Sequence, residues 1–300
     1  MYTSKPSTWK KNLRQLLGAS VLGLGLLSAA TAAAESKGKV HLAYVEWAST
    51  VASTNVMKAV LEQAGFEVDT TSLTGAAMWQ AVASGDADAL LAGWLPITHE
   101  DYYAKLGDQV VDAGVSLDGA KLGLAVPAYA EVDSIEDLNA NAESFGGEII
   151  GIDPGAGIQR LTEDVVKEYG LNLRLRDGSD ATMTAALGNA IQNNENIVVT
   201  SWTPHWMFAR WDLKYLDDPK EVYGGAEQIH TITRKGLKED LPEAYAILSN
   251  FNWTPEDMGE VMLMIEQPGA DPFESAKKWV AEHPELVNEW LNVEQTTGNN

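Results

Sequence analysis

Hydrophobic and polar positions repeat in two alternating patterns along most of the chain. Short apolar runs, typical of buried strands, are followed by segments in which apolar residues recur every three or four positions, as in helices. The predicted strands are 39–47, 67–73, 87–94, 121–129, 148–153, 172–177, 195–202 and 228–236. The predicted helices between them are 48–66 (with Gly65 as the stop), 75–85, 158–170 and 180–192.

Capping signals predict where two further helices begin. Ser134 and Asp137 have the spacing of a capping box, which predicts a short helix over 134–138. Three helices are predicted after residue 236, and one of them begins with Thr254 as N-cap and Pro255 at the first helical position.

This order of elements predicts an α/β fold with two lobes. The strand–helix series occurs twice, over 39–101 and over 148–212, and such alternation is typical of largely parallel sheets. The strands at 121–129 and 228–236 are the expected crossings between the lobes. In open α/β sheets, ligands bind beyond the carboxyl ends of the strands, so a cleft between the lobes is the expected site.

The N-terminus is typical of a secretory signal peptide. Four basic residues precede an apolar stretch that ends in three alanines, and no acidic residue occurs before Glu35. We predict cleavage near Ala34; the alternative is an uncleaved anchor helix. No other stretch of about 18 apolar residues occurs, so the mature chain is not expected to span a membrane.

Composition narrows the candidate chemistry. Without the four basic residues of the signal peptide, 17 Lys and Arg stand against 43 Asp and Glu, a net charge of −26, which argues against nucleic-acid and anionic-lipid partners. The chain has no Cys, and its five His are scattered, so neither a disulfide nor a metal site is expected, and no cofactor motif is apparent.

Three tryptophans stand at the ends of predicted strands. Gly93-Trp94-Leu95-Pro96 in the first half matches Ser201-Trp202-Thr203-Pro204 in the second, and Trp47 also ends its strand. Indole faces attract cations that donate no strong hydrogen bond, above all a quaternary ammonium group. The alternative is core or hinge packing, which is the role expected of the other tryptophans of the mature chain: Trp79, Trp206, Trp211, Trp253, Trp279 and Trp290.

A glycine-rich turn supplies candidate donors for an anion. In IDPGAGIQR (152–160) a strand ends and a helix begins, so the N–H groups of Gly157 and Ile158 can bind a carboxylate with help from the helix dipole. His99 is a candidate third donor. The alternatives are a plain turn between strand and helix, and a histidine that merely starts a helix.

These motifs together resemble the glycine betaine-binding proteins of ABC transporters, the OpuAC-type family. The resemblance covers roughly residues 38–292 and is carried by AGWLPITH (92–99), GIDPGAGI (151–158), TSWTPHWMF (200–208), YLDDPKEVYG (215–224) and HTITRKG (230–236). It implies a type II periplasmic binding protein fold, with one lobe formed by 35–122 plus 232–300 and the other by 123–231. Some members carry the two halves in the opposite order.

The resemblance also implies the site and the partners. A cage of Trp47, Trp94 and Trp202 would hold trimethylammonium, while Gly157, Ile158 and His99 would bind the carboxylate. The chain would capture glycine betaine or a related osmoprotectant in the periplasm and deliver it to a permease and ATPase in the inner membrane.

Two alternatives remain open from sequence. A choline or carnitine receptor would keep the cage and change the anion-binding part. A secreted glycoside hydrolase would combine indoles with two catalytic carboxylates, for which four acids lie near predicted strand ends: Glu46, Asp86, Asp88 and Asp153. Capping and solvated surface are the ordinary roles of such acids, and no nucleophile–His–acid arrangement stands out.

Overall fold

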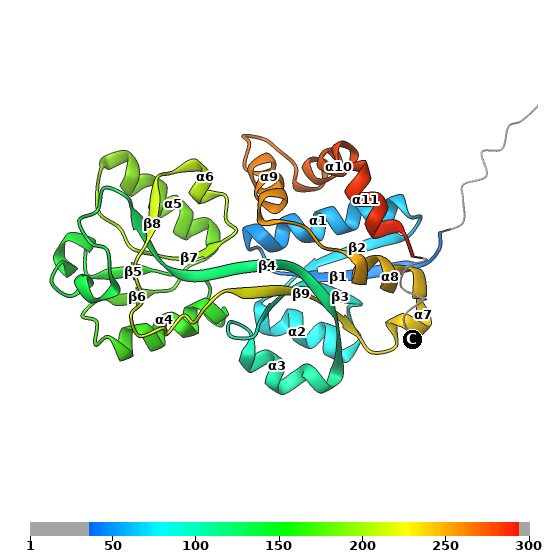
Figure 1. The fold of residues 1–300 in the computed structure, drawn as a ribbon, viewed down its shortest axis with the longest axis horizontal. Coiled ribbons are helices and arrows are strands. Elements are labelled where there is room, and N and C mark those ends of the chain that lie inside the picture. Colours follow the sequence, from blue (N-terminus) through cyan, green and yellow to red (C-terminus); the bar gives the residue numbers. More distant parts are fainter. Residues whose placement is uncertain (1–35, 294–300) are drawn as a thin grey trace, which may run out of the picture. The chain divides into compact units, whose positions relative to one another are not determined.

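A continuous sheet of nine strands runs through residues 36–293, the part of the chain that the computed structural model describes (Figure 1). The strand order is β2-β1-β3-β9-β4-β7-β5-β6, and β8 pairs with β4 beside this path. The predicted signal peptide lies outside the described residues. Within residues 36–293, no helix combines the length and the apolar character that a membrane span requires.

Lobe 1 is built around the parallel strands β1 (Lys39–Tyr44), β2 (Glu67–Ser72) and β3 (Ala89–Leu95). Helix α1 (Ala48–Gln63) covers one face of these strands, while α2 (Gly75–Ser84) and α3 (Glu100–Leu106) lie on the other (Figure 1). All seven residues of β3 are buried, as expected of a strand covered on both faces.

Lobe 2 repeats this plan with the parallel strands β5 (Glu148–Ile150), β6 (Arg174–Arg176) and β7 (Val199–Thr203). Its longer helices are α4 (Gly157–Glu168) and α5 (Asp180–Asn193). The smaller elements are the 3-10 turns η2 (Ile135–Leu138) and η3 (Ala142–Phe145), helix α6 (Met207–Arg210) and strand β8 (Leu213–Tyr215). The predicted capping box of Ser134 and Asp137 is confirmed at the start of η2.

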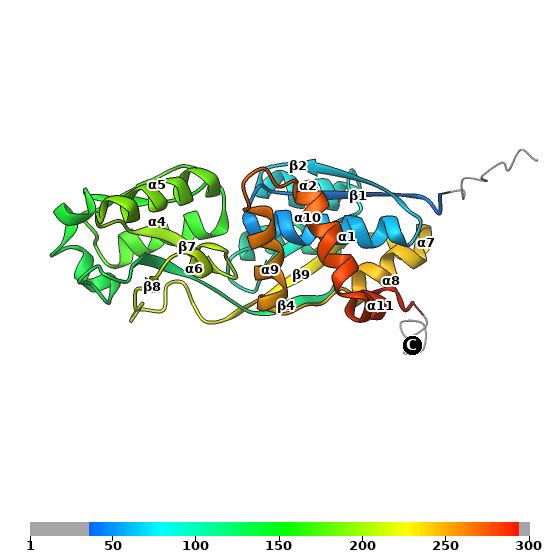
Figure 2. The same cartoon turned by 90° about the horizontal axis from the view of Figure 1, so that it is seen from above.

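One long strand belongs to both lobes. After a short 3-10 turn, η1 (Gly107–Gln109), β4 (Val110–Pro127) pairs with β9 (Glu227–Arg234) over residues 110–120, then with β7 and β8 over 121–127. Figure 2 shows it passing from one lobe to the other alongside the chain that leads into β9. The sequence predicted only its second half, because polar residues and glycines break the pattern of 110–120. Gly114, at a φ of 133°, lies at one of the register shifts there.

Five helices follow β9, where the sequence predicted three. They are α7 (Leu237–Asp240), α8 (Pro242–Asn250), α9 (Pro255–Ile265), α10 (Pro272–Glu282) and α11 (Pro284–Leu291). The last four start with proline, which fits the first turn of a helix but not its interior, so each proline divides the segment. The predicted Thr254 cap of α9 is confirmed.

Tryptophans contribute large side chains to the buried core of both lobes. Trp79, Trp279 and Trp290 are among the largest fully buried side chains, and Trp206 and Trp253 are also buried. The prediction that they are packing residues is therefore confirmed. Trp211 is only half-buried, although it packs against Trp206 with ring centroids 5.3 Å apart.

Candidate ligand-binding site

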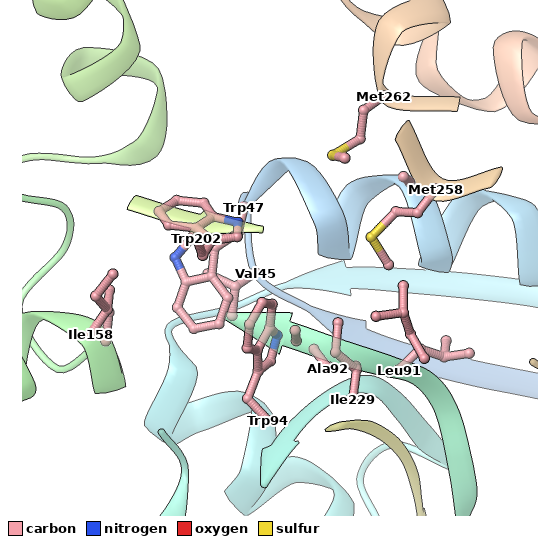
Figure 3. Close-up of a cluster of buried hydrophobic side chains, with 14 of the residues drawn as sticks. Val45, Trp47, Leu91, Ala92, Trp94, Ile158, Trp202, Ile229, Met258 and Met262 are labelled. Atoms are coloured by element: carbon pink, nitrogen blue, oxygen red, sulfur yellow. The ribbon is translucent and has the colours of Figure 1, made fainter. Parts of the chain in front are cut away.

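A small pocket lies between elements of the two lobes. It brings together all six candidate residues of the sequence analysis, from segments up to 155 positions apart: Trp47, Trp94, His99, Gly157, Ile158 and Trp202. Ser49, Thr98, Leu122, Ile152 and Ala156 complete the lining. Figure 3 shows the three indoles gathered beside the start of α1, with Ile158 facing them from α4.

The three tryptophans come from three different chain segments. Trp47 is the N-cap residue of α1, Trp94 lies in β3, and Trp202 lies in β7 opposite Leu122 of β4. Their exposed fractions are only 7%, 4% and 4%. Trp47 and Trp94 therefore face Trp202 from the opposite lobe, which is the arrangement that the strand-end pattern predicted.

Gly93 sets the position of Trp94. A Cβ atom there would lie 2.8 Å from Cγ1 of Ile232 and 3.2 Å from the carbonyl oxygen of His230, both on β9. Only glycine lets the two strands approach so closely. The segment after the strand then turns at Pro96, so that the chain returns past the pocket through Thr98 and His99.

The start of α4 presents two backbone donors to the pocket. Its N-cap residue, Ala156, has no side-chain cap, and among residues 36–293 no acceptor is found for the N–H groups of Gly157 and Ile158. Gln159 holds the preceding turn: its Oε1 accepts from the N–H of Ile152 at 3.0 Å, and its Nε2 donates to Asp177 at 2.8 Å. Free N–H groups at the positive end of a helix dipole are chemically suited to accept an anion.

His99 is a neutral, fully buried ring. Its Nδ1 accepts from the backbone N–H of Trp94 at 3.2 Å and from Nε1 of Trp79 at 3.3 Å, so its hydrogen is on Nε2. Burial lowers the pKa of His99 to about 3, although a hydrogen bond with the Ala92 carbonyl acts in the opposite direction. The ring therefore offers one N–H, and no positive charge, at neutral pH.

Glu227 supports the site but was not predicted from the sequence. This carboxylate is 1% exposed and accepts from the N–H groups of Ile97 at 2.6 Å and Thr98 at 2.8 Å, as well as from the Thr98 hydroxyl. It thereby fixes the loop that leads to His99. In sequence, Glu227 looks like an ordinary acid before a strand, because its partners lie about 130 positions away.

The four acids considered for a hydrolase do not gather at the pocket. No Asp or Glu is among the described residues that line it. Asp88 pairs with Arg234 at 2.7 Å, Asp86 accepts from Ser84, and Asp153 accepts from the indole N–H of Trp47 at 2.8 Å. Glu46 lines a different groove. Within residues 36–293, no group of His, Asp and Glu side chains is arranged to hold a metal ion.

The two-lobed α/β fold and the aromatic pocket between its lobes are features of the class of solute-binding proteins. The family model described as the substrate binding domain of ABC-type glycine betaine transport systems, OpuAC, matches residues 38–282. The chain belongs to this family, whose members serve transport and are not enzymes.

Related proteins agree with this assignment. This chain is 51% identical over 173 positions to the glycine betaine/carnitine transport binding protein GbuC of Listeria monocytogenes. The match covers 56% of each protein, so it spans little more than half of that relative.

Solved structures confirm the type II fold. Lactococcal OpuAC, in a closed conformation complexed with glycine betaine, is 46% identical with a TM-score of 0.81, and the match covers 85% of this chain and 100% of the other. A glycine betaine/L-proline-binding protein from Borrelia burgdorferi is 36% identical with a TM-score of 0.82, covering 86% and 98%. A choline-binding protein complexed with choline is 29% identical with a TM-score of 0.78, covering 84% and 91%.

Proposed function

We propose that this chain captures glycine betaine for an ABC importer, with the trimethylammonium group between Trp47, Trp94 and Trp202 and the carboxylate at the start of α4. The observation that carries the proposal is the joint presence, in one pocket, of three indoles and two backbone N–H groups without an acceptor. A small zwitterion needs both features at once.

The cage alone is too weak for tight binding. An indole face contributes about 0.5–2 kcal/mol to a cation once water is excluded. Micromolar affinity requires about 8 kcal/mol, so three indoles reach it only with help from the other end of the ligand. The carboxylate loses its water on burial and needs hydrogen bonds in return. The Gly157 and Ile158 N–H groups supply two of these.

His99 is the proposed third donor to the carboxylate. Its one hydrogen, on Nε2, is shared between the ligand and the Ala92 carbonyl, so its contribution is smaller than that of a protonated imidazole. His99→Ala should therefore weaken glycine betaine binding more than choline binding, since choline has no carboxylate. Equal losses for both ligands in paired titrations would remove His99 from the anion-binding part.

Choline is the second candidate ligand, because a relative at 29% identity is a choline-binding protein in complex with choline. The free N–H groups at Gly157 and Ile158 favour glycine betaine, because its carboxylate can accept a hydrogen bond from each of them. The hydroxyl group of choline does not need two such donors. Carnitine, which the name of the Listeria relative includes, carries both a trimethylammonium group and a carboxylate but is longer.

The proposed setting follows from the sequence and the family. The mature chain faces the outside of the membrane, in the periplasm after cleavage near Ala34, and delivers its ligand to a permease and ATPase complex. Residues 35–122 plus 232–300 would move as one lobe and residues 123–231 as the other. The sheet supports such a division, since β4 changes partners between Ala120 and Lys121.

Titration of the purified mature chain tests the proposal. Glycine betaine, proline betaine, carnitine and choline are added in turn while tryptophan fluorescence is followed, and the ligand is recovered afterwards. We expect glycine betaine to bind most tightly and to return unchanged. Tighter binding of choline would favour the second candidate, and consumption of any added compound would contradict a transport role.

A further inference from the structure

Two carboxylates of lobe 2 hold the segment of lobe 1 that carries the first cage tryptophan. Asp153, in the turn before α4, accepts from the indole Nε1–H of Trp47 at 2.8 Å. Asp180, the first residue of α5, accepts from the backbone N–H of Ala48 at 2.8 Å through its Oδ2 atom. Adjacent residues of one lobe are thus bound by two acids of the other.

Asp180 also supports the cage tryptophan of its own lobe. Its Oδ1 lies 3.1 Å from Nε2 of His205, and Nδ1 of His205 accepts from the N–H of Met207 at 3.1 Å, so the hydrogen is on Nε2. The His205 ring packs edge-on against Trp202, with centroids 4.7 Å apart. One carboxylate, only 5% exposed, therefore connects the supports of Trp47 and Trp202.

Neither acid lines the pocket, so their effect on the ligand is indirect. Their hydrogen bonds to Trp47 and Ala48 form only when the lobes are together. Because Ala48 begins α1, its N–H is one of the donors that a helix start leaves free, and a carboxylate is its favourable partner.

We propose that Asp153 and Asp180 are positioning residues: they form an interlobe latch that stabilises the closed form and thereby sets the affinity for the ligand. The inference rests on the proposed function. The latch raises affinity by slowing ligand release, since release requires the lobes to separate, whereas capture takes place before the bonds form.

Asp180→Asn tests the latch without a change of side-chain shape, because asparagine is isosteric with aspartate. An amide has one acceptor oxygen, so its NH2 group must face either the Ala48 N–H or the His205 Nε2–H. Asp153→Ala removes the partner of the indole, while Asp153→Asn keeps an acceptor oxygen and should restore part of the effect. Asp101→Asn is the matched control, because Asp101 pairs with Arg160 of lobe 2 at 3.1 Å but is exposed, and exposed pairs contribute little.

The experiment measures glycine betaine binding by stopped-flow fluorescence and the distance between the lobes by spin labels. Since the chain has no native Cys, Ala104→Cys on α3 and Lys167→Cys on α4 supply exposed labelling sites in every variant. We expect Asp180→Asn and Asp153→Ala each to weaken binding about tenfold, mainly through faster dissociation, with a smaller closed fraction at equal saturation. Asp101→Asn should change binding less than twofold.

Other outcomes separate the latch from the proposed function. Unchanged dissociation rates and unchanged distances in both variants, with thermal melts showing that they are folded, would overturn the latch. If Asp180→Asn does not fold, the comparison of Asp153→Ala with Asp153→Asn tests the latch instead. A wild type that binds none of the four ligands would contradict the proposed function instead. In that case, identical distance distributions of unliganded wild type and Asp180→Asn would overturn the latch as well.

Discussion

At the scale of single residues, the three cage tryptophans differ in what holds them. Trp47 donates its indole N–H to Asp153, whereas Trp202 is supported by the edge of the His205 ring. Trp94 lies in a strand that closely approaches β9 at Gly93. Substitutions at the three positions should therefore have different consequences, although each indole face would meet the same cation.

Replacement of each cage residue by Ala should weaken glycine betaine binding by about 1–3 kcal/mol, because packing is lost together with the cation–π interaction. Trp47→Ala should cost the most, since it also removes a bond between the lobes. Phe should restore part of the affinity at Trp94 and Trp202, and less at Trp47. Calorimetric titration measures these differences; unchanged affinity in all three Ala variants would place the cage elsewhere.

His99 should make stability depend on pH. Its pKa of about 3 in the folded chain lies below the value of about 6.5 expected when unfolded, so the unfolded state binds more protons between these values. The contribution of His99 to the free energy of unfolding is therefore complete above pH 6.5 and is lost as the pH falls toward 3.

The variant His99→Gln should flatten this part of the profile, because glutamine has no proton to gain. Urea unfolding of wild type and variant at pH 7, 5 and 4 gives the comparison, and the carboxylates common to both proteins cancel in the difference. Parallel profiles would show that the ring is not buried in its neutral form.

At the scale of elements, the start of α4 fits tightly against the other lobe. A Cβ atom on Gly157 would lie 2.1 Å from the carbonyl oxygen of Thr98, a backbone atom that cannot move aside easily. Gly157→Ala should therefore keep the start of α4 away from the loop of residues 96–99. We expect more than a tenfold loss of glycine betaine affinity in titrations, with little change in the circular dichroism spectrum.

A helical glycine elsewhere provides the control for this substitution. Gly259 in α9 has no atom near the position of an added Cβ, so Gly259→Ala should leave binding unchanged and raise the free energy of unfolding by about 0.5–1 kcal/mol. An equal loss of affinity in both variants would indicate general damage rather than a clash at Thr98.

Local pattern was enough for most elements and for the candidate cage. Apolar runs and helical periodicity predicted α1, α4, α5 and β3. The strand-end tryptophans, with Gly157, Ile158 and His99, all line one pocket. Helix α3 was not predicted, because none of its residues is buried and its sequence therefore shows no apolar face. Glu227 and Asp180 were missed because their partners, Thr98 and Ala48, lie in distant segments and become neighbours only through the fold.

At the scale of the whole molecule, closure of the lobes should depend on the ligand. Both walls of the cage contact a ligand only when the lobes are together, so a bound ligand favours that form. Small-angle X-ray scattering of the mature chain should show a smaller radius of gyration at saturating glycine betaine than without it. The same radius in both conditions would contradict movement between the lobes.

The path of the chain through the sheet also has a consequence for biogenesis. Strand β3 lies between β1 and β9, yet β9 is synthesised only after all the other strands. A chain that emerges from the ribosome N-terminus first therefore exposes one edge of β3, an apolar strand, until residues 227–234 arrive. The unpaired N–H and C=O groups of such an edge can form hydrogen bonds with strands of other chains. Stalled or truncated chains should accordingly aggregate through this edge and depend on chaperones, although the second lobe, whose strands are continuous in sequence, has already been synthesised.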